Sequence, residues 1–224
     1  MLATRYRLVV FDLDGTLVDS RHDIAHSANL TLGLLGLPTL PPDTIIGFVG
    51  GGVRNLALRS LTAAAGSGTA IPSPEEFVAR FLPIYAEHLL DRTLPYSGVV
   101  DTLAALDAAS IAMAVVTNKP AEPARRIVEG LGLGPFALIV GGDSAPTRKP
   151  DPEPLLRAVR HVGAEVSETL YVGDMGIDVE TASAAAVRFV GVTWGLASRA
   201  DLAAAGAREL IDRMTDLVRL AGVS

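Results

Sequence analysis

The sequence predicts an α/β protein in which a doubly wound parallel sheet carries an inserted, all-helical domain. Three observations support this prediction. Short apolar segments that end at polar residues or glycines recur along the chain, segments with helical periodicity lie between the later ones, and a long helical stretch follows the first. Strands that are apolar throughout and alternate with helices are typical of a parallel sheet covered on both faces.

Five apolar segments are predicted to be strands of this sheet. They are residues 7–12 (RLVVFD), 111–118 (IAMAVVTN), 136–143 (FALIVGGD), 169–174 (TLYVGD) and 188–195 (RFVGVTWG). Each is short, aliphatic and bounded by turn-forming or polar residues, as expected of buried strands. Helices are expected between them, over residues 95–110, 122–131, 152–162 and 178–186.

The spacing of these segments indicates an insertion after the first strand. Asp12 and Asn118 lie 106 positions apart, more than three times one strand-helix-strand step of about 30 residues. Within this interval, residues 21–36 and 74–90 have apolar residues at the three- and four-residue spacing of helices. We therefore expect a core domain of residues 1–19 and 93–224, and a helical cap domain of residues 20–92.

The composition narrows the classes of function. With 224 residues and 49% hydrophobic content, the chain can form a sizeable core. The net charge of -6 and the scattered basic residues argue against a nucleic-acid surface. The absence of cysteine excludes a disulfide framework and a thiolate zinc site. We find no membrane span and no signal-peptide pattern, and expect a cytoplasmic protein that acts on a small molecule; the oligomeric state cannot be inferred.

Polar side chains follow the ends of three predicted strands, and one more lies in a loop. In order along the chain they are Asp12, Asp14, Thr117, Asn118, Lys149, Asp174 and Asp178. In open parallel sheets the ligand site lies beyond the carboxyl ends of the strands, near the reversal of strand order. We therefore expect these side chains to meet at one edge of the sheet.

The chemistry of this set suits the hydrolysis of phosphate monoesters. Crowded carboxylates repel one another, so a metal, a phosphate or a proton must offset their charge. A carboxylate can attack phosphorus to form an aspartyl-phosphate, and a second acid can protonate the leaving oxygen and later activate water. Mg²⁺ prefers carboxylate ligands, while lysine and hydroxyl groups can hold phosphate oxygens.

The order D-x-D-G-T, T-N, K-P and G-D-x-x-x-D resembles the haloacid-dehalogenase-like superfamily of phosphohydrolases over nearly the whole chain. The stretches GFVGGGVRNLALRSL, LPYSGV, VVTNKP, GGD, RKPDPEPL and VGD are similar to its phosphoglycolate phosphatase branch. This resemblance implies a Rossmann-like core whose helical cap is inserted after the first motif. It also implies Mg²⁺ as cofactor and a phosphorylated metabolite as substrate.

The resemblance implies a role for each of the polar residues. Asp12 would be the nucleophile and Asp14 the general acid and base. Thr117, Asn118 and Lys149 would hold the phosphate, with Lys149 also part of the catalytic set. The magnesium ligands would be Asp12, the backbone carbonyl of Asp14 and Asp174, with Asp178 ligating the metal or orienting a metal-bound water.

For the substrate we expect 2-phosphoglycolate, because the stretch FVGGGVRNL resembles the phosphoglycolate phosphatase cap. Its carboxylate needs a cationic partner, and Arg54, which follows the turn at residues 50–52, could present a bidentate fork. A solvated position for Arg54 on a helix is the alternative. A pyrophosphatase or a phosphomutase also stays open, because the core motifs do not encode the leaving group.

Two non-enzymatic alternatives are less consistent with the sequence. A phosphorylated receiver domain also uses an aspartyl-phosphate, a threonine and a lysine, but its phosphoacceptor follows a later strand than its acidic pair. Here Asp12 and Asp14 share one motif, DLD. A non-catalytic phosphate-binding protein would be expected to lack one of these two acids. Release of phosphate from an aryl phosphate with Mg²⁺ separates an enzyme from both.

A few other residues near these motifs bear on the site or on the first cap helix. Asp19 is an acid at the expected hinge, with a structural and a functional role both open, and Ser20 could cap the first cap helix. His22 and His26 have the spacing of a helical metal site but lack a third ligand, which favours a solvated face. Residues 175–177 (MGI) depart from the polar or charged residue that often lies between the last two acids, so a difference is expected only around the metal site, since both acids are present.

Overall fold

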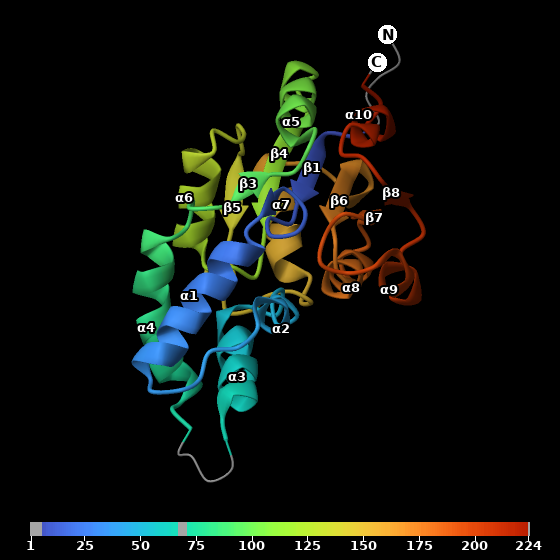
Figure 1. Cartoon of the computed structure of the whole chain (residues 1–224). Coiled ribbons are helices and arrows are strands. Elements are labelled where there is room, and N and C mark those ends of the chain that lie inside the picture. Colours follow the sequence, from blue (N-terminus) through green and yellow to red (C-terminus); the bar gives the residue numbers. More distant parts are fainter. Residues whose placement is uncertain (1–5, 67–70, 224) are drawn as a thin grey trace. The chain divides into compact units, whose positions relative to one another are not determined.

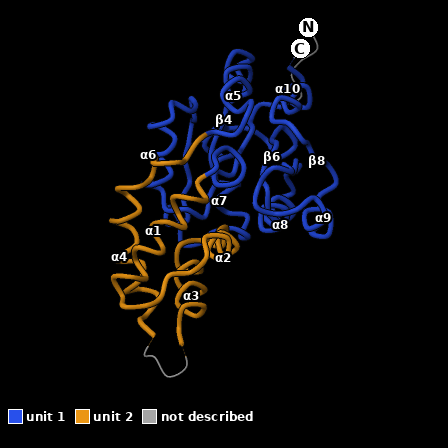
Figure 2. The backbone as a smooth tube through the Cα atoms, in the orientation of Figure 1, with its two compact units in different colours: residues 1–19, 95–224 blue, residues 20–94 orange. Residues whose placement is uncertain are grey.

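The computed structural model describes residues 6–66 and 71–223 and divides the chain into two compact units. The core unit comprises residues 1–19 and 95–224, and the helical unit comprises residues 20–94. Figure 2 distinguishes the two by colour. The chain thus leaves the core unit after Asp19 and returns to it at Pro95, and two short segments at these crossings, β2 (Val18–Asp19) and β3 (Leu94–Pro95), form a separate two-stranded sheet.

The core unit is built on a parallel sheet that has six strands within the described part of the chain (Figure 1). The strand order is β5-β4-β1-β6-β7-β8. The strands are β1 (Leu8–Phe11), β4 (Ala112–Val116), β5 (Leu138–Val140), β6 (Thr169–Gly173), β7 (Arg188–Val192) and β8 (Leu210–Ile211). This sheet confirms the predicted fold class. Of the six strands of this sheet, the sequence pattern missed β8, whose two residues are too few to show any periodicity.

The central strand β1 brings the two halves of the sheet together. It pairs in parallel with β4 on one side and with β6 on the other, which places Phe11 beside both Val115 and Val172. The chain runs outward from β1 through β4 to β5, and then crosses back to β6 and continues through β7 to β8. The reversal of strand order therefore lies between β1 and β6, and the residues that follow these two strands border the expected ligand site.

Both faces of the sheet are buried. Leu8 and Val10 of β1 belong to a core cluster with Leu155 of α7 (Glu153–Val162) and Ala182 of α8 (Gly176–Ala184). The alternate side chains of β1, including Val9, point to the opposite face and are equally inaccessible. Burial on both faces explains why these strands are aliphatic throughout. The helices of the core unit are α5 (Val99–Ala108), α6 (Ala121–Gly130), α7 (Glu153–Val162), α8 (Gly176–Ala184), α9 (Arg199–Ala204) and α10 (Asp216–Leu220), with a 3₁₀ turn at Val166–Glu168.

The helical unit consists, in its described part, of α1 (Arg21–Leu34), α2 (Pro42–Ile46), α3 (Val53–Ala64) and α4 (Pro74–Glu87). Ser73 begins α4 by accepting a hydrogen bond from the Glu76 amide, and three aromatic rings four residues apart stack along the buried face of this helix. Asp23 of α1 accepts hydrogen bonds from the amides of Arg92 and Thr93, at 3.0 and 2.8 Å. This carboxylate ties the end of the unit to its first helix.

Ser20 precedes α1, but the predicted capping role for its side chain is wrong. No side-chain capping hydrogen bond is formed, and the backbone of Ser20 has φ -101° and ψ 3°. A capping side chain usually requires an extended backbone, which turns the oxygen toward the free amides of the first turn. His22 and His26 are exposed on the same helix, as expected of a solvated face. No helix in residues 6–66 or 71–223 is long and apolar enough to cross a membrane.

Candidate active site

Three buried carboxylates meet beyond the carboxyl ends of β1 and β6. One oxygen from each of Asp12, Asp174 and Asp178 lies within 4.8 Å of the others. Asp12 follows β1 directly, Asp174 follows β6, and Asp178 lies in the first turn of α8. The neighbouring registers of β1 and β6 thus bring together acids that lie far apart in the sequence, at the predicted edge of the sheet.

Lys149 places an ammonium group among these carboxylates. Its Nζ lies 2.8 Å from Asp12 Oδ1 and 2.7 Å from Asp178 Oδ1, and it donates to the Tyr171 hydroxyl at 3.1 Å. The Tyr171 hydroxyl in turn donates to Asp178 Oδ1 at 2.7 Å. Burial disfavours the charged ammonium, but the two aspartates outweigh this effect and hold the pKa of Lys149 above its ordinary value. Lys149 is therefore a fixed positive charge in the site.

The three carboxylates carry more negative charge than the Lys149 ammonium can balance, and the pKa values of Asp12 and Asp174 are raised. Burial raises the pKa of Asp12 to about 6; Lys149 opposes the shift, whereas Asp178 and Asp14 add to it. Burial likewise raises the pKa of Asp174 well above its usual range, and the charges of Asp12 and Asp178 add to it. A hard divalent cation with oxygen ligands would relieve this excess of negative charge, so the donor set fits Mg²⁺.

Two hydrogen-bond donors hold the Asp174 carboxylate, and two glycines leave space for its side chain. Thr16 Oγ1 donates to its Oδ1 at 2.9 Å, and the Leu196 amide donates to its Oδ2 at 2.7 Å. Gly15 has φ +87°, and a Cβ there would lie 2.2 Å from Asp174 Oδ2. A Cβ on Gly195 would lie 2.3 Å from Asp174 Cβ. The D-x-D-G-T motif contains Gly15 and Thr16, but their contact with Asp174 could not be inferred from the sequence.

Both carboxylate oxygens of Asp178 already accept hydrogen bonds. Oδ1 faces Lys149 and Tyr171, and Oδ2 accepts from the Met175 amide at 3.1 Å. Because this last donor is a backbone group, the unusual residues 175–177 still provide it. A Cβ on Gly173 would lie 2.6 Å from Asp178 Cβ, so the close approach of strand and helix requires glycine. These contacts hold the Asp178 carboxylate in place, and the carboxylate in turn holds the Lys149 ammonium in position.

Thr117 and Asn118 are buried directly after β4. Thr117 Oγ1 accepts from the Lys119 amide at 3.2 Å, and Asn118 Nδ2 donates to the Lys149 carbonyl at 3.2 Å. A Cβ on Gly142 would lie 2.4 Å from the Asn118 carbonyl oxygen, so a glycine is needed where the segment after β5 passes this loop. Asn118 thus positions the segment that carries Lys149, a role that the sequence did not reveal.

Asp14 forms an ion pair that sequence reasoning missed. Its Oδ1 lies 2.9 Å from Lys119 Nζ, and the side chains are 12% and 5% exposed, respectively. Lys119 stands next to Asn118 in the motif VVTNKP, so its position beside a predicted strand end was the available signal. Only the pairing of β1 with β4 shows that it reaches Asp14.

Arg54 lies in the first turn of α3, in the helical unit. Its Nε is 2.9 Å from Glu75 Oε1, and both side chains are largely exposed. The structure therefore shows Arg54 as one half of a surface ion pair. Its predicted contact with a substrate carboxylate stays a prediction.

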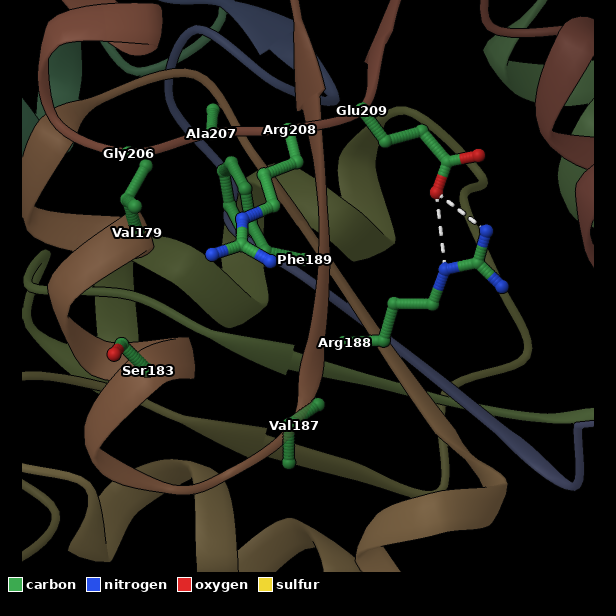
Figure 3. Close-up of a pocket in the computed structure, with 9 residues that line it drawn as sticks. All are labelled: Val179, Ser183, Val187, Arg188, Phe189, Gly206, Ala207, Arg208 and Glu209. Atoms are coloured by element: carbon green, nitrogen blue, oxygen red, sulfur yellow. Dashed lines mark hydrogen bonds and ion pairs between the residues drawn. The ribbon is translucent and has the colours of Figure 1, made fainter.

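A separate hollow of about 530 Å³ lies at the amino end of β7. Figure 3 shows its lining, in which the Arg188 guanidinium donates to the Glu209 carboxylate at 3.0 and 2.7 Å. None of the predicted site residues lines it. The carboxylate cluster, which follows the opposite ends of the strands, is therefore the candidate active site.

Comparison with known proteins agrees with the geometry of this site. Residues 9–192 match the family model described as haloacid dehalogenase-like hydrolase. The chain is 40% identical over 213 residues to the phosphoglycolate phosphatase of Chromobacterium violaceum, covering 93% of this chain and 96% of that protein. It is 38% identical over 220 residues to phosphoglycolate phosphatase 1 of Pseudomonas aeruginosa, covering 96% and 80% of the two chains.

A solved structure extends the likeness to three dimensions. The crystal structure of a predicted phosphoglycolate phosphatase from Haemophilus somnus matches with a TM-score of 0.91 and 31% identity, covering 97% of this chain and 99% of that one. The family match includes β1 from Val9 onward, all of β4, β5, β6 and β7, and the acids that follow β1 and β6. The chain therefore belongs to the family of haloacid dehalogenase-like hydrolases.

Proposed function

We propose that the protein is a magnesium-dependent phosphomonoester hydrolase that acts on 2-phosphoglycolate through an aspartyl-phosphate on Asp12. The observation that carries this proposal is the position of Lys149, whose ammonium contacts both Asp12 and Asp178 within a cluster of buried carboxylates. The relatives named phosphoglycolate phosphatase at about 40% identity over most of the chain support the same activity.

Asp12 is the proposed nucleophile. A carboxylate oxygen of Asp12 attacks phosphorus, the bond between phosphorus and the ester oxygen breaks, and an acyl phosphate forms on Asp12. With a pKa of about 6, the Asp12 carboxyl is mostly ionised at pH 7, and the carboxylate is its nucleophilic form. Lys149, Thr117 and Asn118 supply an ammonium, a hydroxyl and an amide for the phosphate oxygens.

Asp14 is the proposed proton donor and acceptor. In the first step its carboxyl gives a proton to the leaving oxygen, which departs as the hydroxyl of glycolate. In the second step the Asp14 carboxylate takes a proton from water as the water oxygen attacks phosphorus. The bond between phosphorus and Asp12 then breaks, phosphate leaves, and both carboxyl groups return to their starting states.

The residues that would hold Mg²⁺ are Asp12, the backbone carbonyl of Asp14 and Asp174, with Asp178 ligating the metal or orienting its water. When bound, the ion would offset the repulsion between carboxylates and phosphate and stabilise charge on the phosphoryl oxygens. Asp174 suits this role because Thr16 and Leu196 occupy only one lone pair on each of its oxygens. A cytoplasmic location stays a prediction of the sequence.

The direct test is release of phosphate from 2-phosphoglycolate with and without Mg²⁺, on the parent and on Asp12→Asn. The parent should hydrolyse the substrate only with the metal, and Asp12→Asn should be inactive while its circular dichroism stays unchanged. Asp107→Asn, which changes an exposed acid on α5, is the matched control and should retain parental activity. Near-normal turnover by Asp12→Asn would rule out covalent catalysis through Asp12.

A second arm separates the role of Asp14 and the type of substrate. Asp14→Asn should lose turnover because an amide cannot donate the proton, and it should accumulate acid-labile phosphoenzyme with an activated aryl phosphate. A substrate panel with pyrophosphate and a sugar phosphate tests the pyrophosphatase and phosphomutase alternatives. Preference for either over 2-phosphoglycolate would keep a phosphoryl-transfer enzyme but overturn the substrate.

A further inference from the structure

The two lysines of this chain, Lys119 and Lys149, both lie at the candidate site, whereas all other permanently cationic side chains are arginines. Both lysines are buried, with 5% and 2% of their side chains exposed. Elsewhere the chain uses arginine for its surface ion pairs, as in Arg54 with Glu75. A compact ammonium with three N–H donors is thus found only beside the carboxylates of the candidate site.

Lys149 has a role in the mechanism proposed above, but Lys119 has none. The Lys119 ammonium lies 2.9 Å from Asp14 Oδ1, and so beside the group that must reach the leaving oxygen of the substrate. Burying an ammonium is costly unless it is paired, and Asp14 meets that need in this structure. An ammonium has three N–H donors and can be shared by more than one anion, so a substrate carboxylate that comes close to Asp14 can also bind to it.

We propose that Lys119 is a specificity-determining residue, whose ammonium binds a carboxylate that the substrate carries next to its phosphoester. This inference rests on the proposed function. During catalysis the ester oxygen must come within hydrogen-bond reach of the Asp14 carboxyl, about 2.6–3.2 Å. In 2-phosphoglycolate a single methylene separates that oxygen from the carboxylate. A substrate carboxylate attached so close to Asp14 falls within reach of the Lys119 ammonium.

The alternative is that Lys119 only balances the charge of Asp14. The two roles predict different outcomes, because Asp14 serves every phosphomonoester, whereas a carboxylate contact serves only substrates that have one. Loss of a charge-balancing lysine would slow all substrates alike. Loss of a carboxylate ligand would slow 2-phosphoglycolate selectively.

The experiment measures kcat/KM for 2-phosphoglycolate and for 2-hydroxyethyl phosphate, in which an uncharged alcohol replaces the carboxylate. Both substrates are assayed with Mg²⁺ on the same preparations of the parent, Lys119→Met and Arg125→Met. The ratio of the two kcat/KM values does not depend on the fraction of folded enzyme, so partial unfolding of a variant cannot mimic the effect. Arg125 is an exposed cation on α6, the helix that follows Lys119, and is the matched control.

We expect the parent to prefer 2-phosphoglycolate and Lys119→Met to reduce that preference by roughly 10- to 100-fold, the range for a lost charged hydrogen bond. Arg125→Met should keep the parental ratio. Lys119→Arg retains a cation and should recover part of the preference. An unchanged ratio in Lys119→Met, with activity either kept or lost equally on both substrates, would overturn the inference.

A binding measurement gives a second readout. Glycolate should inhibit hydrolysis of an aryl phosphate without a carboxylate by the parent, and the inhibition constant should rise roughly 10-fold or more in Lys119→Met. If the inhibition constant does not change, the carboxylate does not bind at Lys119. Failure of the proposed function gives a different result from failure of this inference. In that case the parent itself would release no phosphate from any substrate of the panel with Mg²⁺.

Discussion

The ammonium of Lys149 lies 2.8 Å from the carboxylate of Asp12, and both side chains are almost fully buried. This contact sets the electrostatics of the site. The Lys149 charge lowers the pKa of Asp12 against a larger effect of burial, and the balance leaves that pKa at about 6. The ionisation of Asp12, the proposed nucleophile, therefore depends on a lysine from a distant loop.

Replacing Lys149 by methionine should destabilise the protein strongly at neutral pH. The variant keeps the length of the side chain but leaves Asp12 and Asp178 without their shared cation, and breaking a buried pair costs about 3–5 kcal/mol. Urea unfolding at pH 7.5 and pH 5 measures the effect, which should shrink at the lower pH as Asp12 takes up a proton. Arg125→Met, an exposed charge removed in the same way, should change stability by less than about 0.5 kcal/mol. Equal stability of Lys149→Met and the parent at pH 7.5 would contradict this account.

The stability of the metal-free protein should fall as pH rises from about 4 to 7. The pKa of Asp12 is raised in the folded state to about 6, so folding favours its protonated form. Its contribution is fully present below the unfolded pKa and is lost as pH rises through 6, for a total of about 3 kcal/mol. The raised pKa of Asp174 acts in the same direction.

Urea unfolding in EDTA at several pH values between 4.5 and 7.5 checks this slope. Asp12→Asn should flatten it, and Mg²⁺ should restore stability at pH 7.5 more than at pH 5, where the carboxyl groups hold protons instead. The idea is wrong if the metal-free parent becomes more stable with rising pH and Asp12→Asn shows the same curve.

Asp174→Asn should separate metal binding from folding. Without metal the variant should be as stable as the parent or more so, because it removes a buried charge whose pKa is raised by burial. With saturating Mg²⁺ the parent should show a rise in melting temperature that Asp174→Asn lacks. Asp107→Asn controls for loss of an acid and should respond to Mg²⁺ like the parent. An unchanged Mg²⁺ titration in Asp174→Asn would remove this residue from the proposed ligands.

Gly15→Ala should weaken the site through Asp174. A Cβ at Gly15 would lie 2.2 Å from Asp174 Oδ2, on a backbone with φ +87°. Gly132 also has a positive φ, of +62°, but a Cβ there meets nothing within 4 Å. Gly132→Ala therefore reports backbone strain alone, of about 1–3 kcal/mol. We expect Gly15→Ala to lose more stability than this control and also its thermal response to Mg²⁺, and equal losses in the two variants would show that Asp174 is not displaced.

Arg54→Ala tests the remaining prediction for the helical unit. Its ion pair with Glu75 is exposed, so its loss should change stability by less than about 1 kcal/mol. If Arg54 contacts the substrate carboxylate, its loss should lower kcat/KM for 2-phosphoglycolate by a factor that corresponds to about 1.5–3 kcal/mol of transition-state stabilisation. The kcat/KM for an aryl phosphate should not change. Arg80→Ala removes another exposed, ion-paired arginine of the same unit and should be neutral. Equal losses on both substrates would count against the contact.

The sequence alone was sufficient for the fold class and for grouping three acids that the structure brings together, Asp12, Asp174 and Asp178. The buried strands of a parallel sheet are aliphatic on both faces, so β1, β4 and β6 stood out as continuous apolar segments. Because the carboxyl ends of parallel strands lie at one edge, the residues that follow them, such as Asp12 and Asp174, could be grouped before any coordinates were known. Periodicity could not reveal β8, which has two residues, or show that the Ser20 side chain makes no cap.

The partners of these acids were decided only by the tertiary structure. Lys119 pairs with Asp14, Thr16 with Asp174 and Tyr171 with Asp178, and no local pattern marks any of the three contacts. A sequence pattern reports which face of an element is apolar, but a contact between side chains depends on strand register and on the close approach that glycines permit. Register is a property of paired strands, so the contacts that set the charge of the site emerge only when the sheet is assembled.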